Sequence, residues 1–114
     1  MRSVVSQHQH AVVIGLSGEL DAHTTGRLRS LLAEQLLAGP GNLVLDLAQL
    51  SFIDSAGLAA LISADKGTRR AGMRLVLAAP GSSVRKVLGL TGIDAVLTIV
   101  DSVEQALDLL APPP

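Results

Sequence analysis

Cysteine is absent from this sequence of 114 residues. Its absence excludes disulfide scaffolds, thiolate zinc sites and cysteine nucleophiles, and it is compatible with a reducing compartment. Aromatic residues are nearly absent as well, because Phe52 is the only one and neither Trp nor Tyr occurs. Modules that stack nucleic-acid bases need aromatic platforms, so we expect no nucleic-acid partner.

Neither sign of charge dominates, since 9 Lys and Arg residues and 10 Asp and Glu residues give a formal net charge of −1. The sequence therefore has neither a basic stripe for a phosphate backbone nor an acidic tail. No apolar run reaches the roughly 20 residues of a membrane span, and the start Met1–Val4 is not typical of a signal peptide. We therefore expect a cytoplasmic protein without direct membrane insertion.

The apolar residues that are present, mainly Leu, Val, Ile and Ala, form runs typical of strands. Strands are predicted at residues 3–7, 11–17, 42–47, 74–79 and 95–100. Residues 49–53 are interpreted as a short connector. The run at 42–47 is apolar on both faces except at Asp46, which is typical of a central strand covered by helices.

Helical spacing of apolar residues follows the second strand and each later strand. Caps and breaks then predict four helices: one capped by Asp21 or Thr24 and stopped at 39–41, one from Ser55 to Arg70, one capped by Ser82 or Ser83, and one opened by a capping box at Ser102–Gln105. The resulting order is ββαβαβαβα. It predicts an α/β fold whose sheet, after an opening hairpin, is mostly parallel with right-handed crossovers.

Residues 1–114 are expected to form a single domain, with 112–114 as a frayed tail. Its central stretch runs from Leu43 to Ile62, where a polar pair, Asp54 and Ser55, separates a buried strand from a helix. Sites in α/β folds lie at the carboxyl ends of strands, and the N–H groups of a helix start favour negative charge. The serine at this junction is therefore the first candidate for a functional role.

Catalytic interpretations of Ser55 find little support. A nucleophile elbow needs glycine two residues before the serine, and Ile53 stands there, so that only Gly57 fits the pattern. A triad of Ser55, His23 and Asp21 can be drawn, but the spacing does not favour it. Phosphate-binding glycine motifs are missing.

A metal site is equally poorly supported by the sequence. Asp46 and Asp54 both lie near the end of one strand, but no His or third carboxylate accompanies them. We therefore expect no catalytic residue, metal or cofactor.

Two interpretations of the polar pair stay open from the residues alone. In the first, Asp54 and Asp21 are helix caps and Ser55 is a first-turn hydroxyl. In the second, Ser55 accepts a phosphate, which adds about −1.5 to −2 charges at a helix end that tolerates them. A partner docked on that surface would then meet a new charge, and Asp21 and Asp54 would add repulsion.

Three segments carry a resemblance to a known family: Gly18–Asp21 (Gly-Glu-Leu-Asp), Leu45–Leu47 (Leu-Asp-Leu) and Leu50–Leu58 (Leu-Ser-Phe-Ile-Asp-Ser-Ala-Gly-Leu). With them the chain resembles the bacterial anti-sigma factor antagonists, single-domain members of the STAS (sulfate transporter and anti-sigma factor antagonist) superfamily. The resemblance covers nearly the whole chain and extends to residues 75–77, 84–88 and 91–93. It implies a mixed sheet of about five strands with helices mainly on one face.

The resemblance also implies a function. In regulatory members, an anti-sigma factor that is also a serine kinase phosphorylates the serine after the motif aspartate, which is Ser55 here. The unphosphorylated antagonist binds the anti-sigma factor and frees the sigma factor, and a serine phosphatase reverses the modification. Position 56, often Ser or Thr in the family, is Ala56 in this chain. The implied switch surface comprises Asp21, Asp54, Ser55, Ala56, Gly57 and Leu58.

Alternatives to this function remain. The superfamily is functionally mixed, and the second hypothesis is a STAS accessory subunit of a membrane lipid-transport complex. A serine hydrolase is the third hypothesis. The sequence leaves open whether the protein forms a homodimer.

Overall fold

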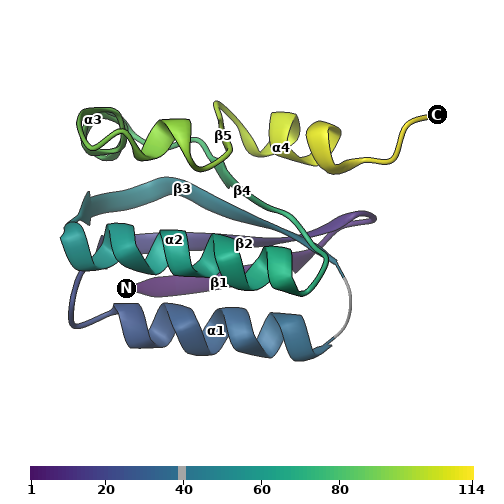
Figure 1. The fold of residues 1–114 in the computed structure, drawn as a ribbon, viewed down its shortest axis with the longest axis horizontal. Helices are drawn as coiled ribbons and strands as arrows, with labels where there is room; N and C mark the ends of the chain where they lie inside the picture. Colours follow the sequence, from purple (N-terminus) through teal and green to yellow (C-terminus); the bar gives the residue numbers. More distant parts are fainter. Residues whose placement is uncertain (39–40) are drawn as a thin grey trace.

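The computed structural model describes residues 1–38 and 41–114. Its elements in chain order are β1 (Arg2–Gln7), β2 (Ala11–Leu20), α1 (Thr25–Ala38), β3 (Asn42–Ile53), α2 (Ser55–Arg70), β4 (Leu75–Ala78), α3 (Ser82–Leu90), the 3-10 helix η1 (Ile93–Ala95), β5 (Ile99–Val100) and α4 (Val103–Leu110) (Figure 1). Apart from η1, the predicted order of elements is confirmed.

The five strands form one sheet in the order β1-β2-β3-β4-β5. The first two strands are antiparallel, and each later neighbouring pair is parallel. The predicted α/β class and the mostly parallel sheet with an opening hairpin are therefore confirmed. Because β2 to β5 run in the same direction, their carboxyl ends meet at one edge of the sheet. The four α-helices follow the four parallel strands, so each of them begins near that edge.

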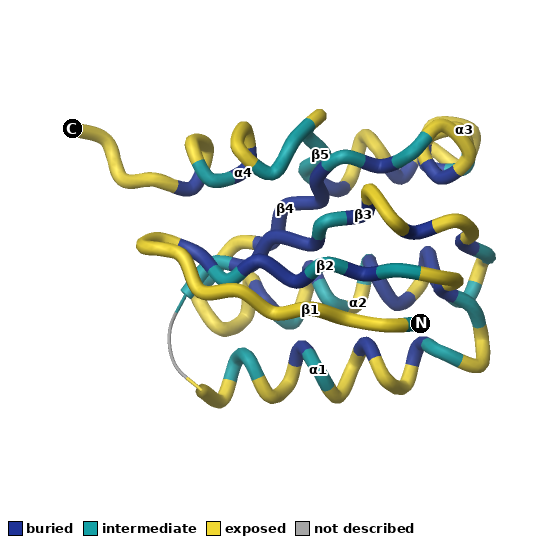
Figure 2. Tube along the Cα trace, turned by 180° about the vertical axis from the view of Figure 1, so that it is seen from behind, coloured by how far each residue is buried: buried dark blue, intermediate teal, exposed yellow. Residues whose placement is uncertain are grey.

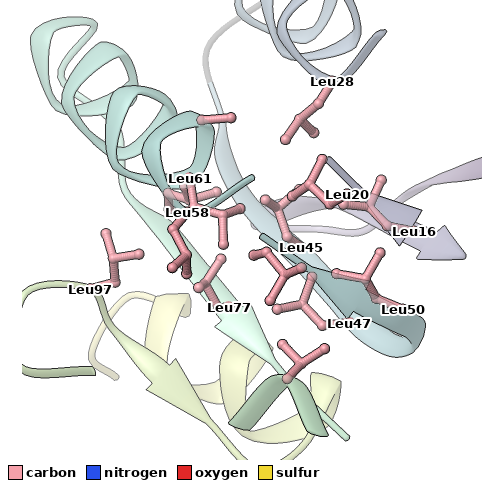
Figure 3. Packing of buried hydrophobic residues seen from close by; sticks show 14 of the residues in the cluster. Leu16, Leu20, Leu28, Leu45, Leu47, Leu50, Leu58, Leu61, Leu77 and Leu97 are labelled. Carbon is pink, nitrogen blue, oxygen red and sulfur yellow. The ribbon is translucent and has the colours of Figure 1, made fainter. Parts of the chain in front are cut away.

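Two apolar clusters flank the sheet. The larger one joins residues of β2, β3 and β4 to α1, α2 and α3. Figure 3 shows leucines of the three strands and of α1 and α2 packed together. The smaller one lies under α4 and is built mainly from short side chains such as Val13, Val44 and Ala78. Three of the four α-helices therefore cover one face, as the family resemblance predicted. Figure 2 shows that β1 is exposed along its length, whereas β4 is buried.

The second and third strands are both longer than predicted, since β2 continues to Leu20 and does not end at residue 17. Residues 49–53 are not a connector, because β3 continues to Ile53 and stays paired with β2. The pairing register shifts twice, between Gly15 and Ser17 and between Gly18 and Glu19. These irregularities break the alternation of buried and exposed side chains, which is why the pattern misled the prediction.

Two further predictions need correction. The strand predicted at 95–100 is confined to Ile99–Val100, because Gly92 adopts a left-handed conformation (φ 75°) and opens the 3-10 helix. Neither Ser82 nor Ser83 caps α3, since Gly81 is its N-cap and makes no side-chain cap hydrogen bond.

The predicted capping box of the last helix is confirmed in modified form. The Ser102 hydroxyl accepts the backbone N–H of Gln105 at 3.0 Å. The Gln105 side chain reaches back to the N–H of Asp101, at 2.8 Å, one residue before the cap. The predicted break after α1, at 39–41, lies mainly outside the described residues. Within those residues, no helix combines the length and apolarity that a membrane crossing requires.

Candidate functional site

Asp54 starts α2. Its backbone is extended (φ −112°, ψ −172°), as is usual for an N-cap, and its Oδ1 accepts the N–H of Gly57 at 2.9 Å. Its carbonyl oxygen accepts the N–H of Leu58 at 2.9 Å, the first turn of the helix. The capping interpretation of Asp54 is therefore confirmed, and it leaves Ser55 as the first helical residue with its side chain exposed.

Gly57 permits a close approach between the start of α2 and the end of β2. A Cβ atom at this position would clash with the carbonyl oxygen of Leu20 and would lie 2.8 Å from Cγ1 of Ile53. The N–H of Asp54 donates to the same Leu20 carbonyl at 3.3 Å. The start of α2 is therefore fixed against β2, and this also fixes the position of Ser55.

Asp21 lies at the end of β2, beside Asp54. Leu20 and Ile53 are the last paired residues of the two strands, and the two aspartates directly follow them. Since the strands are parallel neighbours, both aspartates leave the sheet at the same edge.

Asp21 also organises the turn into α1. Its Oδ1 accepts the backbone N–H of His23 at 2.9 Å and lies 3.3 Å from Oγ1 of Thr24. The Thr24 hydroxyl oxygen accepts the N–H of Asp21 at 2.9 Å, and the Asp21 carbonyl accepts the N–H of Thr25 at 3.0 Å. These bonds hold the turn before α1, and among the described residues neither side chain accepts an N–H of the first turn of that helix, so the predicted side-chain cap by Asp21 or Thr24 is wrong. The Asp21 carboxylate holds a turn rather than an imidazole, which gives the hydrolase triad no support.

The switch surface predicted from the sequence divides into an exposed part and a supporting part. Ser55 is exposed, while Asp21, Asp54 and Ala56 are half-buried. The remaining two members of the predicted set, Gly57 and Leu58, are buried. Leu58 belongs to the larger apolar cluster, where Figure 3 shows it beside Leu61. These two residues therefore position the surface from below.

The edge carries negative charge. Glu19, Asp21 and Asp54 all lie at the ends of β2 and β3, and Glu19 is exposed. The ion pairs of the described residues, Arg69–Asp65 and Arg85–Asp101, involve other carboxylates. A phosphate on Ser55 would therefore join acids that have no cationic partner within 4 Å in the described part of the chain.

Two features of this edge were not singled out from the sequence. Phe52 is 48% exposed although it is the only aromatic residue, and Glu19 is its register partner on β2. The sequence carries no signal for the exposure of Phe52, because Leu50 and Ile53, three residues apart, are both buried where the register shifts. The other candidate carboxylate, Asp46, accepts the N–H of Ala48 at 3.0 Å where the register shifts.

Comparison with known proteins identifies the family of this chain. A model of the STAS domain matches residues 2–106, so the chain belongs to the STAS domain family. An anti-sigma F factor antagonist of Paenibacillus polymyxa is 28% identical over 104 residues, which are 90% of this chain and 89% of that protein. The anti-sigma-F factor antagonist RsfB of Mycobacterium tuberculosis is 27% identical over 103 residues, 90% of this chain and 84% of that protein.

Solved structures of anti-sigma factor antagonists have the same fold as this chain. An anti-sigma factor antagonist from Mycobacterium paratuberculosis has a TM-score of 0.85 at 26% identity, covering 96% of this chain and 92% of that one. The antagonist SpoIIAA in its unphosphorylated form has a TM-score of 0.77 at 26% identity, covering 94% of each chain. The phosphorylated form of the Bacillus cell fate determinant SpoIIAA has a TM-score of 0.70 at 24% identity, covering 96% and 100%. The predicted resemblance to the anti-sigma factor antagonists is therefore confirmed.

Proposed function

We propose that this protein is an anti-sigma factor antagonist whose binding to its partner is switched off by phosphorylation of Ser55. In this proposal the chain is the substrate of a kinase and acts by protein–protein binding. The observation that carries it is the place of Ser55, exposed at the first position of a capped helix and flanked by two aspartates at one sheet edge.

Ser55 is a chemically suitable acceptor. The first turn of a helix has backbone N–H groups that favour negative charge, so a phosphate there does not have to disrupt the fold. The Asp54 carboxylate, and not the Ser55 hydroxyl, accepts the N–H of Gly57 and so caps the helix. The modification is therefore expected to change the surface while leaving α2 intact.

The same charge explains release of the partner. Phosphorylation adds about −1.5 to −2 charges beside Asp21 and Asp54. A partner that fits the unmodified surface would have to bury that charge, and burying an uncompensated charge at an interface costs several kcal/mol. The unphosphorylated form then binds the anti-sigma factor and frees the sigma factor, and a serine phosphatase restores it.

The test is phosphorylation by the anti-sigma factor kinase of the same organism with labelled ATP. The protein should take up one phosphate, and Ser55→Ala should take up none. Ser82→Ala is the matched control, because Ser82 is also exposed and is also the first residue of a helix at this edge. It should be phosphorylated like the unchanged protein. Phosphate retained by Ser55→Ala would refute the proposal.

A further inference from the structure

The place of Phe52 is not explained by packing. The core clusters of the described residues are aliphatic, and this single aromatic side chain stands outside them at 48% exposure. A Phe side chain carries roughly 150–250 Å² of surface that is costly to leave in water. Aromatic residues are enriched at protein interfaces, where they fill pockets on the partner.

Phe52 faces the side of the sheet that α4 only partly covers. Ile53 and its register partner Leu20 both lie in the larger cluster. Phe52 and its register partner Glu19, one residue earlier on each strand, therefore point to the opposite face. The cluster under α4 reaches Val13 on β2 and Val44 on β3 and includes no later residue of either strand. Figure 2 shows β3 buried along its middle and mostly exposed toward its carboxyl end, where Phe52 lies.

Phe52 also lies within reach of any protein that binds at Ser55. The two residues are three positions apart, at most about 10 Å along an extended chain. A standard interface covers about 800 Å² per partner, equivalent to a disc of about 16 Å radius. A partner seated over Ser55 therefore extends over Phe52 if it covers the ends of β2 and β3.

The surroundings of Phe52 are polar. Its register partner Glu19 is exposed, and the hydroxyl of the preceding Ser51 donates to the carbonyl of Gly18 at 2.9 Å. An apolar centre with a polar rim is the usual composition of a binding anchor, and here the rim carries the negative charge of Glu19. A complementary partner would offer an apolar recess with a basic side chain opposite Glu19.

We infer that Phe52 is the apolar anchor by which the anti-sigma factor recognises this antagonist, inserted into an apolar recess on that partner. The inference rests on the proposed function and adds a recognition residue to it. Phe52 acts in binding and not in phosphoryl transfer, since its side chain points away from the helix that carries the hydroxyl.

The test measures binding and phosphorylation of Phe52→Ala with the kinase that modifies Ser55. The dissociation constant should rise at least about tenfold. In phosphorylation assays KM should rise while kcat stays within about twofold, because the Ser55 hydroxyl is untouched. Phe52→Leu, which keeps much of the apolar surface, should recover most of the affinity.

Leu37→Ala is the matched control, because Leu37 is 88% exposed near the far end of α1. It should bind like the unchanged protein, and circular dichroism should show all variants folded. Equal dissociation constants and KM values for Phe52→Ala and the unchanged protein would overturn the inference while leaving Ser55 as the switch. No phosphate at Ser55 in the unchanged protein would overturn the inference together with the proposed function.

Discussion

Two helices, α2 and α3, begin with an exposed serine at the same edge of the sheet, and their starts are built differently. Before Ser55, the side chain of Asp54 caps the helix by accepting the N–H of Gly57 at 2.9 Å. The backbone N–H of Asp54 donates to the end of β2. Before Ser82, Gly81 makes no side-chain cap hydrogen bond. The α3 start follows Ala79, which holds a left-handed backbone (φ 56°) that is unfavourable for a residue with a Cβ atom.

The contrast shows why a helix start with a serine is not by itself a switch. The start of α2 lies between two strand ends that both carry aspartates, and Gly57 fixes it against β2. The start of α3 touches the neighbouring strand through a long hydrogen bond from Ser83 to the carbonyl of Ser51, at 3.4 Å. The backbone at Ser55 is therefore held by more contacts than the backbone at Ser82, and aspartates lie beside it.

The largest stability effect should come from filling the space at Gly57. Gly57→Ala places a methyl group against the backbone of Leu20, and we expect a loss of about 2–3 kcal/mol. Gly67→Ala in the same helix has nothing within 4 Å of the new atom and should instead stabilise by about 1 kcal/mol. Urea denaturation measures both. A neutral Gly57→Ala would mean that α2 is not held against β2 as described.

Removing the cap should have an intermediate effect. Asp54→Ala leaves the N–H of Gly57 without its acceptor and should cost about 1 kcal/mol. Asp54→Asn keeps an acceptor oxygen and should cost less. At the other helix start, Ser82→Ala should change the free energy of unfolding by less than about 0.5 kcal/mol, because no side-chain cap exists there. Equal losses for Asp54→Ala and Ser82→Ala would contradict the contrast between the two starts.

A smaller effect than at Gly57 or Asp54 is expected at Ala79. Ala79→Gly relieves a left-handed conformation that costs roughly 1–2 kcal/mol, and the extra freedom of the unfolded chain offsets about 0.4–1 kcal/mol of that gain. Thermal denaturation should therefore show a stabilisation of about 0.5 kcal/mol. A clear destabilisation would indicate that the Ala79 methyl group contributes packing that outweighs the strain.

The sequence predicted the start of α2 well because two signals coincide there. A buried strand ends in a polar pair, and the apolar period then changes from that of a strand to that of a helix. Asp54 is moreover a preferred N-cap residue. At α3 the two serines suggested a cap by type, but the chain places Gly81 at that position. Residue preference alone is therefore a weak guide to the cap, because neither of the two serine candidates occupies the N-cap position.

Features that depend on pairing between distant segments could not be predicted. The clash that any side chain at Gly57 would meet arises from Leu20, which is remote in the sequence. The exposure of Phe52 follows from two register shifts that carry β3 past its expected end. Both features depend on how β2 and β3 are placed relative to one another, and the pattern of a single sequence does not contain that information.

The central claim is that negative charge at Ser55 removes partner binding while the fold is kept. Titration calorimetry of the anti-sigma factor with Ser55→Glu tests it most directly, with Ser82→Glu as the control at the other helix start. The account predicts a dissociation constant at least about tenfold higher for Ser55→Glu, a loss of about 1.4 kcal/mol, and a change within about twofold for Ser82→Glu. Equal affinity of Ser55→Glu and the unchanged protein would contradict it.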